Sequence, residues 1–371
     1  MRARYIGLLL ILISAFNINT ANSAINRLPE KFLSLSNGYN LGKAGIIFID
    51  SKTQKVVFSR GATKGRASAS VLKLISMTSA SINLGANYRF ETNFYQTNTP
   101  GEYVLEGNGD PWYAVNSYEM KKYHRASLVS LFTSEVLKNA VAGKITLDCY
   151  GIYKADLKSL QSDFGKNITF VFKLLSSRSQ VTPLVTSKIK TIYSPKLSEI
   201  IKFTLLLSDN LLADRLARDA AIKMGFGGDN AGLQKSFIKV LTDLNVPIDG
   251  ITVFDGNGLS HKTRVSVRTL AVLLERIRTN PELKIIYQGL PVAGKTGTLQ
   301  FRFTTDAPKG VGLVTAKTGW INNTVSLAGY ARRGSNYWIF AIIDDSVPNN
   351  EYQRNLARIA IDKLVASIVY K

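Results

Sequence analysis

The amino-acid sequence predicts an α+β fold, in which one antiparallel sheet is assembled from both ends of the chain. Two β-rich runs, 44–50 and 55–60, are joined by a short polar turn, which is typical of a hairpin. Three further β-rich runs lie near the other end, at 310–317, 324–333 and 337–345. Because mostly helical patterns separate the two groups, we expect their strands to meet in one sheet flanked by helices.

Helices are expected where apolar residues recur at helical spacing. The first follows a loop rich in Gly, Ser and Ala, begins at Ser70 and ends near Gly85. The last is amphipathic and closes the chain over 350–369. The helices expected between them cover 197–224, 236–244 and 265–278.

The segment 86–190 differs in character from the rest of the chain. It has Tyr, Asn and Gly-rich turns, such as the Gly-Asn-Gly-Asp-Pro run that ends at Pro111, and one helical pattern over 128–142. We therefore expect residues 86–190 to be an inserted region. Residues 24–85 and 191–371 would together form one domain.

The first 23 residues have the pattern of an export signal. Arg2 and Arg4 precede a dozen mostly apolar residues, and Ser23 ends a run of small residues suited to cleavage. We expect cleavage near Ser23, which would make residues 1–23 a signal peptide and the mature protein an exported one. An uncleaved anchor is the alternative, although the apolar run is shorter than the roughly 20 residues of a membrane-spanning helix.

The charge balance is strongly basic. The chain has 47 Lys plus Arg against 26 Asp plus Glu, a formal net charge of +21, and loss of the signal with its two arginines would leave +19. Such a field favours an anionic partner. Nucleic acid is not expected, because the chain has an export signal and no compact basic run interleaved with aromatics. Electrostatic contact with cell-wall polymers or anionic lipids fits better, and a solvated surface without a dedicated partner is the alternative.

Cysteine and histidine are scarce. Cys149 is the single cysteine, so no disulfide can form within the chain. His124 and His261 are the only histidines, and a zinc site would need both together with distant carboxylates. We predict no metal site and no cofactor. If the protein is a hydrolase, its general base is expected to be a residue other than histidine.

Ser70 and Lys73 form the strongest candidate for nucleophilic chemistry. At this spacing the two side chains share one face of a helix, so the lysine can take the hydroxyl proton. Burial in the apolar surroundings would lower the lysine pKa, as a base requires, and the helix N-terminus would stabilise an oxyanion. Taken alone, a serine in this position is more often simply a helix cap. The same spacing recurs at Ser187/Lys190 and Ser236/Lys239.

Two further motifs follow in order along the chain. Ser208 and Asn210 belong to a Ser-Asp-Asn run that opens an apolar stretch, where the serine could relay a proton and the asparagine could hold a substrate amide. Lys-Thr-Gly occurs at 295–297 and 317–319, and only the second copy ends an expected strand. On a strand edge, Lys317 and Thr318 could bind a carboxylate, and Gly319 would let a backbone approach closely.

This ordered set resembles the penicillin-recognising serine acyltransferases. Flanking runs narrow the resemblance to the class C low-molecular-mass penicillin-binding proteins, the D-alanyl-D-alanine carboxypeptidase/endopeptidase family. These runs are Gly-Asn-Gly-Asp-Pro at 107–111, Ser-Asp-Asn-Leu-Leu-Ala-Asp at 208–214, Asp-Gly-Asn-Gly-Leu-Ser at 255–260, Leu-Pro-Val-Ala-Gly at 290–294 and Ala-Lys-Thr-Gly at 316–319.

The resemblance implies a transpeptidase/β-lactamase-like core with an inserted domain, which is reduced here because only 138 residues separate Ser70 from Ser208. It also implies acylation of Ser70 by D-Ala-D-Ala stem peptides of peptidoglycan in the periplasm, with β-lactams as covalent inhibitors. Lys73 would be the base, Ser208 the relay and Asn210 a substrate holder.

The resemblance also assigns the later Lys-Thr-Gly copy to the active site. Lys317 and Thr318 would form the carboxylate site, and the backbone amides of Ser70 and Trp320 would form the oxyanion hole. Trp320 is a departure, because the family usually has a hydroxyl residue directly after Gly319. We expect this change to favour endopeptidase activity over D-alanine release, and a tryptophan that packs away from the substrate is the alternative.

Two other functions remain open from the sequence. A serine β-lactamase would need a glutamate three residues before the Leu-Asn pair at 244–245, where this chain has Leu241. A fast β-lactamase is therefore disfavoured. A wall-binding protein that keeps the fold but has little or no catalytic activity is compatible with the basic charge and with Trp320.

Overall fold

The computed structural model describes residues 28–114 and 117–371, so the predicted export signal lies outside the described residues. Its first sheet contains β1 (Gly45–Asp50), β2 (Val56–Arg60), β10 (Val314–Ile321), β11 (Thr324–Arg333) and β12 (Asn336–Asp344). The order is β10-β11-β12-β1-β2, and every neighbouring pair is antiparallel. The prediction of one sheet built from both ends of the chain is confirmed.

The strand β10 lies later in the sequence than the predicted 310–317. Pro308–Gly310 form a 3-10 turn, and Gly312 has a positive φ of 71°, so an extended strand begins only at Val314. As a consequence, the second Lys-Thr-Gly run lies inside the strand rather than at its end.

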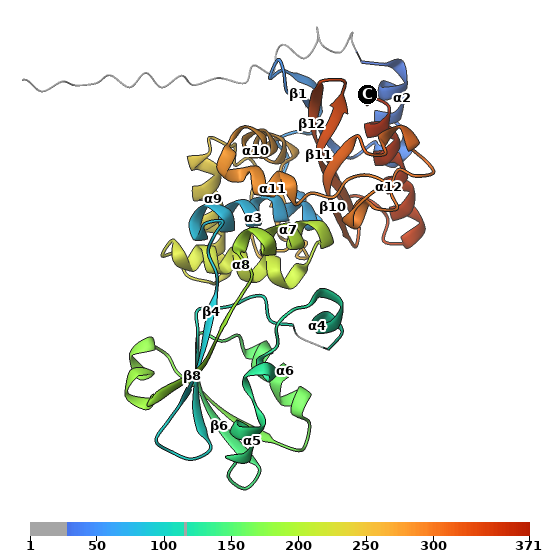
Figure 1. Ribbon diagram of the computed structural model, residues 1–371. Helices are drawn as coiled ribbons and strands as arrows, with labels where there is room; N and C mark the ends of the chain where they lie inside the picture. Colours follow the sequence, from blue (N-terminus) through green and yellow to red (C-terminus); the bar gives the residue numbers. More distant parts are fainter. Residues whose placement is uncertain (1–27, 115–116) are drawn as a thin grey trace, which may run out of the picture.

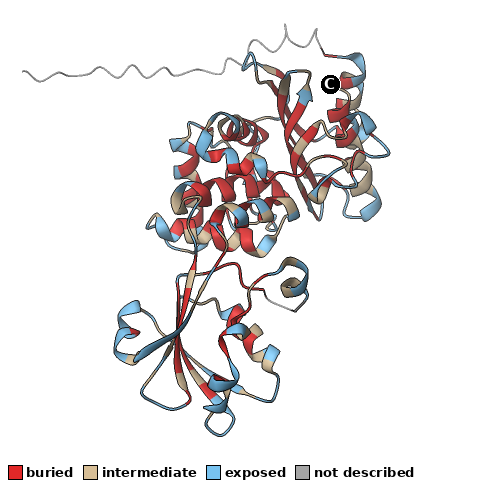
Figure 2. Cartoon of the chain, in the orientation of Figure 1, coloured by how far each residue is buried: buried red, intermediate tan, exposed pale blue. Residues whose placement is uncertain are grey.

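Helices cover both faces of this sheet (Figure 1). One face packs on α12 (Glu351–Ala366) and α2 (Glu30–Ser36), and the other on α3 (Lys73–Leu84) and α10 (Val267–Thr279). Along β1, side chains alternate between the two cores, as a period of two requires. Figure 2 shows buried residues concentrated in the sheet and on the helix faces turned toward it.

The middle helices are α7 (Leu197–Leu207), α8 (Asn210–Lys223), α9 (Asn230–Asp243) and α11 (Lys284–Gln288). The expected single helix over 197–224 is wrong, because the backbone breaks between α7 and α8. Ser208 has a left-handed conformation (φ 60°), and the Asp209 side chain accepts a hydrogen bond from Leu212 N and caps α8. None of the helices in the described part of the chain is long and apolar enough to cross a membrane.

A second sheet lies within the segment 91–193. Its strands are β4 (Glu91–Gln96), β5 (Glu102–Gly107), β6 (Lys144–Tyr150), β7 (Thr169–Leu174) and β8 (Ser187–Tyr193), in the order β7-β6-β5-β4-β8. β5, β6 and β7 are parallel to one another. The chain leaves the helical region through β4 and returns through β8, which pair side by side, so this part extends from the rest (Figure 1).

The second sheet has its own apolar core, to which α6 (Lys154–Phe164) contributes. α4 (Ser117–Tyr123) lies in the chain between β5 and the 3-10 turn Leu128–Leu131. The expected helix over 128–142 is instead a 3-10 turn, Leu128–Leu131, and a short α5, Ser134–Lys138. Thr133 has an extended backbone and caps α5 with its side chain, which prevents one continuous helix.

Candidate active site

Ser70 and Lys73 lie where the 3-10 turn Ala69–Leu72 leads into α3. The expectation that the helix begins at Ser70 is thus wrong by one turn, and Ser70 makes no capping hydrogen bond with its side chain. Its Oγ lies 2.8 Å from Lys73 Nζ. The cap interpretation of Ser70 therefore fails, whereas the contact needed for proton transfer is present.

Lys73 is fully buried, and its Nζ has three polar neighbours. Besides Ser70, these are Asn210 Oδ1 at 2.8 Å and the backbone oxygen of Asn257 at 2.7 Å. A neutral amine can donate to the two oxygens and use its lone pair to accept the Ser70 O–H. Burial lowers the Lys73 pKa to about 7, although the carboxylates of Asp209, Asp255 and Asp214 oppose this. A substantial neutral fraction is therefore present near pH 7.

The Asp-Gly-Asn-Gly turn at 255–258 supports this arrangement. Gly258 has a φ of 83°, and a Cβ built there would lie 2.0 Å from the backbone oxygen of Ala69. Ala69 itself has a positive φ of 51°. Asn257 takes part through its backbone carbonyl oxygen, for which its side chain is not needed. The turn thus packs directly against the backbone that presents Ser70.

The break between α7 and α8 places Ser208 next to Lys317. Ser208 Oγ lies 2.8 Å from Lys317 Nζ, and Lys317 also donates to the carbonyl of Thr318 at 2.9 Å. Lys317 is fully buried, and burial, with the nearby charges of Lys73 and Arg302, lowers its pKa well below the usual range. Arg125, from the inserted region, lies 3.7 Å from the Asp209 carboxylate and helps to hold this loop.

The strand β10 runs close beside the nucleophile. A Cβ added at Gly319 would lie 3.0 Å from the Ser70 backbone nitrogen and 2.1 Å from Ser326 Oγ. Only glycine fits here, which explains the Lys-Thr-Gly pattern on this strand. Thr318 donates its hydroxyl to Thr298 Oγ1 at 2.8 Å, and Trp320 is 39% exposed with Arg354 5.4 Å above its ring.

An open cleft of about 340 Å³ lies over these groups. It contains six of the eight residues that the sequence singled out, while Lys73 and Lys317 lie buried beneath it. The predicted residues that line the cleft are Ser70, Ser208, Asn210, Thr318, Gly319 and Trp320.

Four further residues line the cleft and were not identified as site residues from the sequence. Leu259 lies within the run 255–260, and Thr298 directly follows the first Lys-Thr-Gly run. The sequence therefore had a pattern at or beside both residues, but nothing in it assigned them a role. Arg302 is held by Asp362 through a buried ion pair of 2.5 Å. Arg358 belongs to α12, far away in sequence, and its buried Nε has no hydrogen-bond partner among the described residues.

The duplicate motifs lie elsewhere. Lys295 packs over Gly312, and Thr296 accepts a hydrogen bond from Val292 N in a turn. Ser236 is buried in α9, where its hydroxyl lies 3.1 Å from Ser79 Oγ. Lys190, on β8, donates to the carbonyl of Ser130. None of these side chains lines the cleft described above.

The cleft combines a serine next to a buried amine with a second serine next to a second buried amine. The first pair can create an alkoxide nucleophile without histidine. The second pair can hold or deliver a proton in the same cleft, because Ser208 lines it together with Ser70. The close approach of Gly319 to the Ser70 nitrogen places the backbone of β10 beside the nucleophile, as an oxyanion site formed by both segments would require.

Comparisons with known proteins agree with this chemistry. A "Carboxypeptidase DacB" of Mycolicibacterium smegmatis is 26% identical over 367 residues, covering 85% of this chain and 78% of the relative. Penicillin binding protein 4 (dacB) of Haemophilus influenzae, complexed with a β-lactam, has a similar fold, with a TM-score of 0.67 and 16% identity over 95% of this chain and all of that chain.

A second solved structure is a predatory endopeptidase of Bdellovibrio bacteriovorus, acylated by penicillin G and in complex with an immunity protein. Its TM-score is 0.58 and its identity 16%, over 86% of this chain and 90% of that chain. The model of the D-Ala-D-Ala carboxypeptidase 3 (S13) family matches residues 37–141 and 156–368, which is most of the sequence. This chain therefore belongs to that family and is a class C low-molecular-mass penicillin-binding protein, a serine-type carboxypeptidase.

Proposed function

We propose that the protein is a periplasmic D-alanyl-D-alanine carboxypeptidase/endopeptidase that acts on peptidoglycan stem peptides through an acyl-enzyme on Ser70. The observation that carries this proposal is the 2.8 Å contact between Ser70 Oγ and the buried Lys73 Nζ. The family supports the reaction class, and the predicted export signal supports the compartment.

In the proposed acylation, neutral Lys73 takes the Ser70 proton while Oγ attacks the carbonyl of the penultimate D-alanine. The oxyanion accepts hydrogen bonds from the Ser70 and Trp320 amides. As the carbon–nitrogen bond breaks, the proton that Lys73 took from Ser70 passes to the leaving amine through Ser208, whose hydroxyl is held by Lys317. Asn210 orients the peptide and Lys73 together, since its Oδ1 lies 2.8 Å from Nζ. Water then hydrolyses the ester and restores Ser70.

We assign the substrate carboxylate to the Thr318 hydroxyl and to Arg358. Lys317 lies beneath the cleft and contacts Ser208. We therefore propose that it acts through Ser208 and does not bind the carboxylate directly, as the resemblance had implied. Trp320 brings no hydroxyl to hydrogen-bond the substrate carboxylate, so a nearby cation would have to replace that contact. Arg358 lines the same cleft, and its Nε has no hydrogen-bond partner among the described residues. A guanidinium binds a carboxylate in two-pronged geometry.

The proposal is tested by labelling with a fluorescent penicillin. The native chain should take up one label per molecule, because a β-lactam acylates the same serine. Ser70→Ala should abolish labelling. Ser236→Ala is the matched control, since Ser236 has the same spacing to a lysine but lies in the core, and that variant should still be labelled if it folds. Labelling of Ser70→Ala would contradict the assignment, and an unlabelled native chain would favour a wall-binding protein without catalysis.

We also propose that the basic charge helps to retain the protein on wall material. A retained +19 field would attract anionic polymers, and screening shortens this attraction to roughly 3 Å at 1 M salt. Retention on isolated sacculi should therefore fall as salt rises. Retention that does not depend on salt would assign the charge to an ordinary solvated surface.

A further inference from the structure

A second cavity, of about 710 Å³, lies between the inserted region and α8. None of its lining residues belongs to the cleft over Ser70. It opens beyond the carboxyl ends of the parallel strands β5 and β6, where ligands commonly bind in sheets of this kind. Its volume is within the range of about 300–1,000 Å³ that is typical of small-ligand sites.

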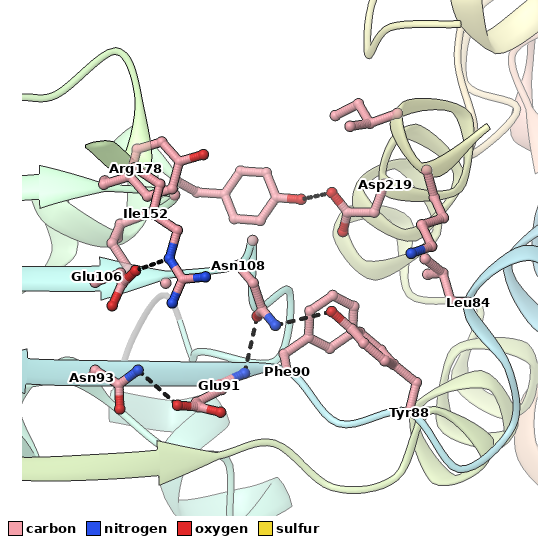
Figure 3. Close-up of a pocket in the computed structure, with 17 residues that line it drawn as sticks. Leu84, Tyr88, Phe90, Glu91, Asn93, Glu106, Asn108, Ile152, Arg178 and Asp219 are labelled. Carbon is pink, nitrogen blue, oxygen red and sulfur yellow. Dashed lines mark hydrogen bonds and ion pairs between the residues drawn. The ribbon is translucent and has the colours of Figure 1, made fainter. Parts of the chain in front are cut away.

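The sheet side of this cavity carries polar side chains that already pair with each other (Figure 3). Arg178 donates to Glu106 at 2.6 Å, and its side chain is 77% exposed. Asn93 donates to Glu91 at 2.7 Å. Tyr95 donates to the other Glu106 oxygen at 3.1 Å, and Thr191 donates to the Asn93 side-chain oxygen at 2.6 Å. On this side, the exposed Arg178 guanidinium therefore offers most of the remaining hydrogen-bonding capacity.

The helix side carries Asp219, opposite these pairs (Figure 3). One of its oxygens accepts a hydrogen bond from the Tyr153 hydroxyl at 2.9 Å, and the other is buried without a partner among the described residues. Burial raises the Asp219 pKa to about 7, against the opposing effects of Tyr153 and Arg215. Lys223, one turn further along α8, also lines the cavity.

Aromatic rings form the remaining wall. Tyr88 and Phe90 pack edge to face with centroids 5.0 Å apart. The Asn108 side chain bridges Tyr88 and β4, since it donates to the Tyr88 hydroxyl and accepts from Glu91 N, both at 2.9 Å. These rings are therefore held in place beside the polar groups.

We propose that this cavity binds a neutral saccharide unit of the wall glycan. Its lining has three carboxyl groups (Glu91, Glu106, Asp219) and two cations (Arg178, Lys223), and Glu106 already pairs with Arg178, so neither a simple anion nor a simple cation is matched. A sugar offers hydroxyls that both donate and accept hydrogen bonds, together with an apolar ring face. The hydroxyls suit the paired side chains and Asp219, and the ring face suits Tyr88.

The site also has a structural connection to the catalytic cleft. The helix α8 begins at Asn210, which contacts Lys73, and its last two turns carry Asp219 and Lys223. A saccharide in this cavity would hold the glycan on one end of α8 while a stem peptide is processed at the other. The inference goes beyond the proposed reaction, because the cavity could bind sugar even if Ser70 had another role.

The test is calorimetric titration of the full chain with tetra-N-acetylchitotetraose, with and without prior treatment with penicillin. We expect saturable binding of one probe per chain that penicillin does not change. Tyr88→Ala should weaken binding at least ~10-fold through loss of the ring, equivalent to about 1.4 kcal/mol. Glu91→Ala, in a partly exposed position, should weaken it several-fold. Tyr39→Ala is the control, since Tyr39 is 93% exposed outside the cavity and should change nothing.

Several results would overturn the proposal. Absence of saturable binding would do so, as would binding that neither variant weakens. Binding abolished by penicillin would place the sugar in the Ser70 cleft. Saturable binding of N-acetyl-lysine amide without binding of the saccharide would identify an ammonium site instead. Thermal unfolding and penicillin labelling of each variant show whether it folds, and labelling of the native chain separately tests the proposed reaction.

Discussion

Changing Asn210 to aspartate tests whether Lys73 is the base in acylation. The new carboxylate would lie about 3 Å from Lys73 Nζ, in place of the Asn210 amide oxygen at 2.8 Å. Lys73 has a pKa of about 7 because burial disfavours its charged form. An opposite charge at such a distance raises the pKa of a lysine by about 1–3, so the midpoint of activity should move to about 8–10.

The magnitude follows from the fraction of neutral lysine. At pH 7 this fraction is about one half in the native chain and between about one tenth and one thousandth in Asn210→Asp. The acylation rate at pH 7 should therefore fall by about 5- to 500-fold. It should recover with rising pH, because only the neutral amine accepts the Ser70 proton.

The assay is the second-order rate of penicillin acylation, measured from pH 5.5 to 10. The native rate should rise with pH through about 7 and then level off. Asn230→Asp is the matched control, since Asn230 begins α9 on the surface and its new charge is solvated. If Asn210→Asp lowers the rate equally at every pH, without moving the midpoint, then Lys73 is not the titrating base.

Three further predictions concern fold and specificity. Gly258→Ala places a Cβ 2.0 Å from the Ala69 carbonyl oxygen, at a residue with a positive φ. It should lower the free energy of unfolding by about 1–3 kcal/mol in urea and slow acylation by penicillin. Unchanged values in both measurements would contradict the packing described. Trp320→Thr should raise D-alanine release from a pentapeptide about 10-fold, with little gain on a cross-linked dimer. Arg358→Gln should lower D-alanine release by a similar factor. If either variant leaves D-alanine release unchanged or moves it the other way, the carboxylate assignment is refuted. Asp156→Asn removes the charge that pairs with the buried Arg215 at 2.8 Å, between α6 and α8. The free energy of unfolding in urea should fall by about 3–5 kcal/mol. A loss below about 1 kcal/mol would show that this ion pair is solvated.

The sheet could be predicted from the sequence because its strands are apolar, short and bounded by turns. The run 324–333 coincides with β11, and the hairpin near the N-terminus pairs as expected. The errors lie where one backbone conformation interrupts a continuous pattern. The left-handed Ser208 splits the predicted helix 197–224, although the residues on both sides keep a helical period.

The catalytic groups near the motifs could also be found, because each lies within a few residues of a short pattern. Arg358 could not, since an arginine on an amphipathic helix has no local feature that distinguishes a cleft from a solvated face. Only the packing of α12 on the sheet brings it to the cleft. The cavity beside Asp219 could not be predicted from the sequence either, because its walls come from separate segments between 84 and 223 that only the fold brings together.

The central claim is that a stem peptide acylates Ser70. The most direct measurement is mass analysis of the protein quenched with acid during turnover of a peptide that ends in D-Ala-D-Ala. Trypsin should release residues 67–73, which follow Arg66 and end at Lys73. The account predicts that this fragment gains the mass of the acyl group, that is, the substrate less one D-alanine, and that Ser70→Ala shows neither the adduct nor D-alanine release. Continued release of D-alanine by Ser70→Ala, or an adduct on another fragment, would contradict it.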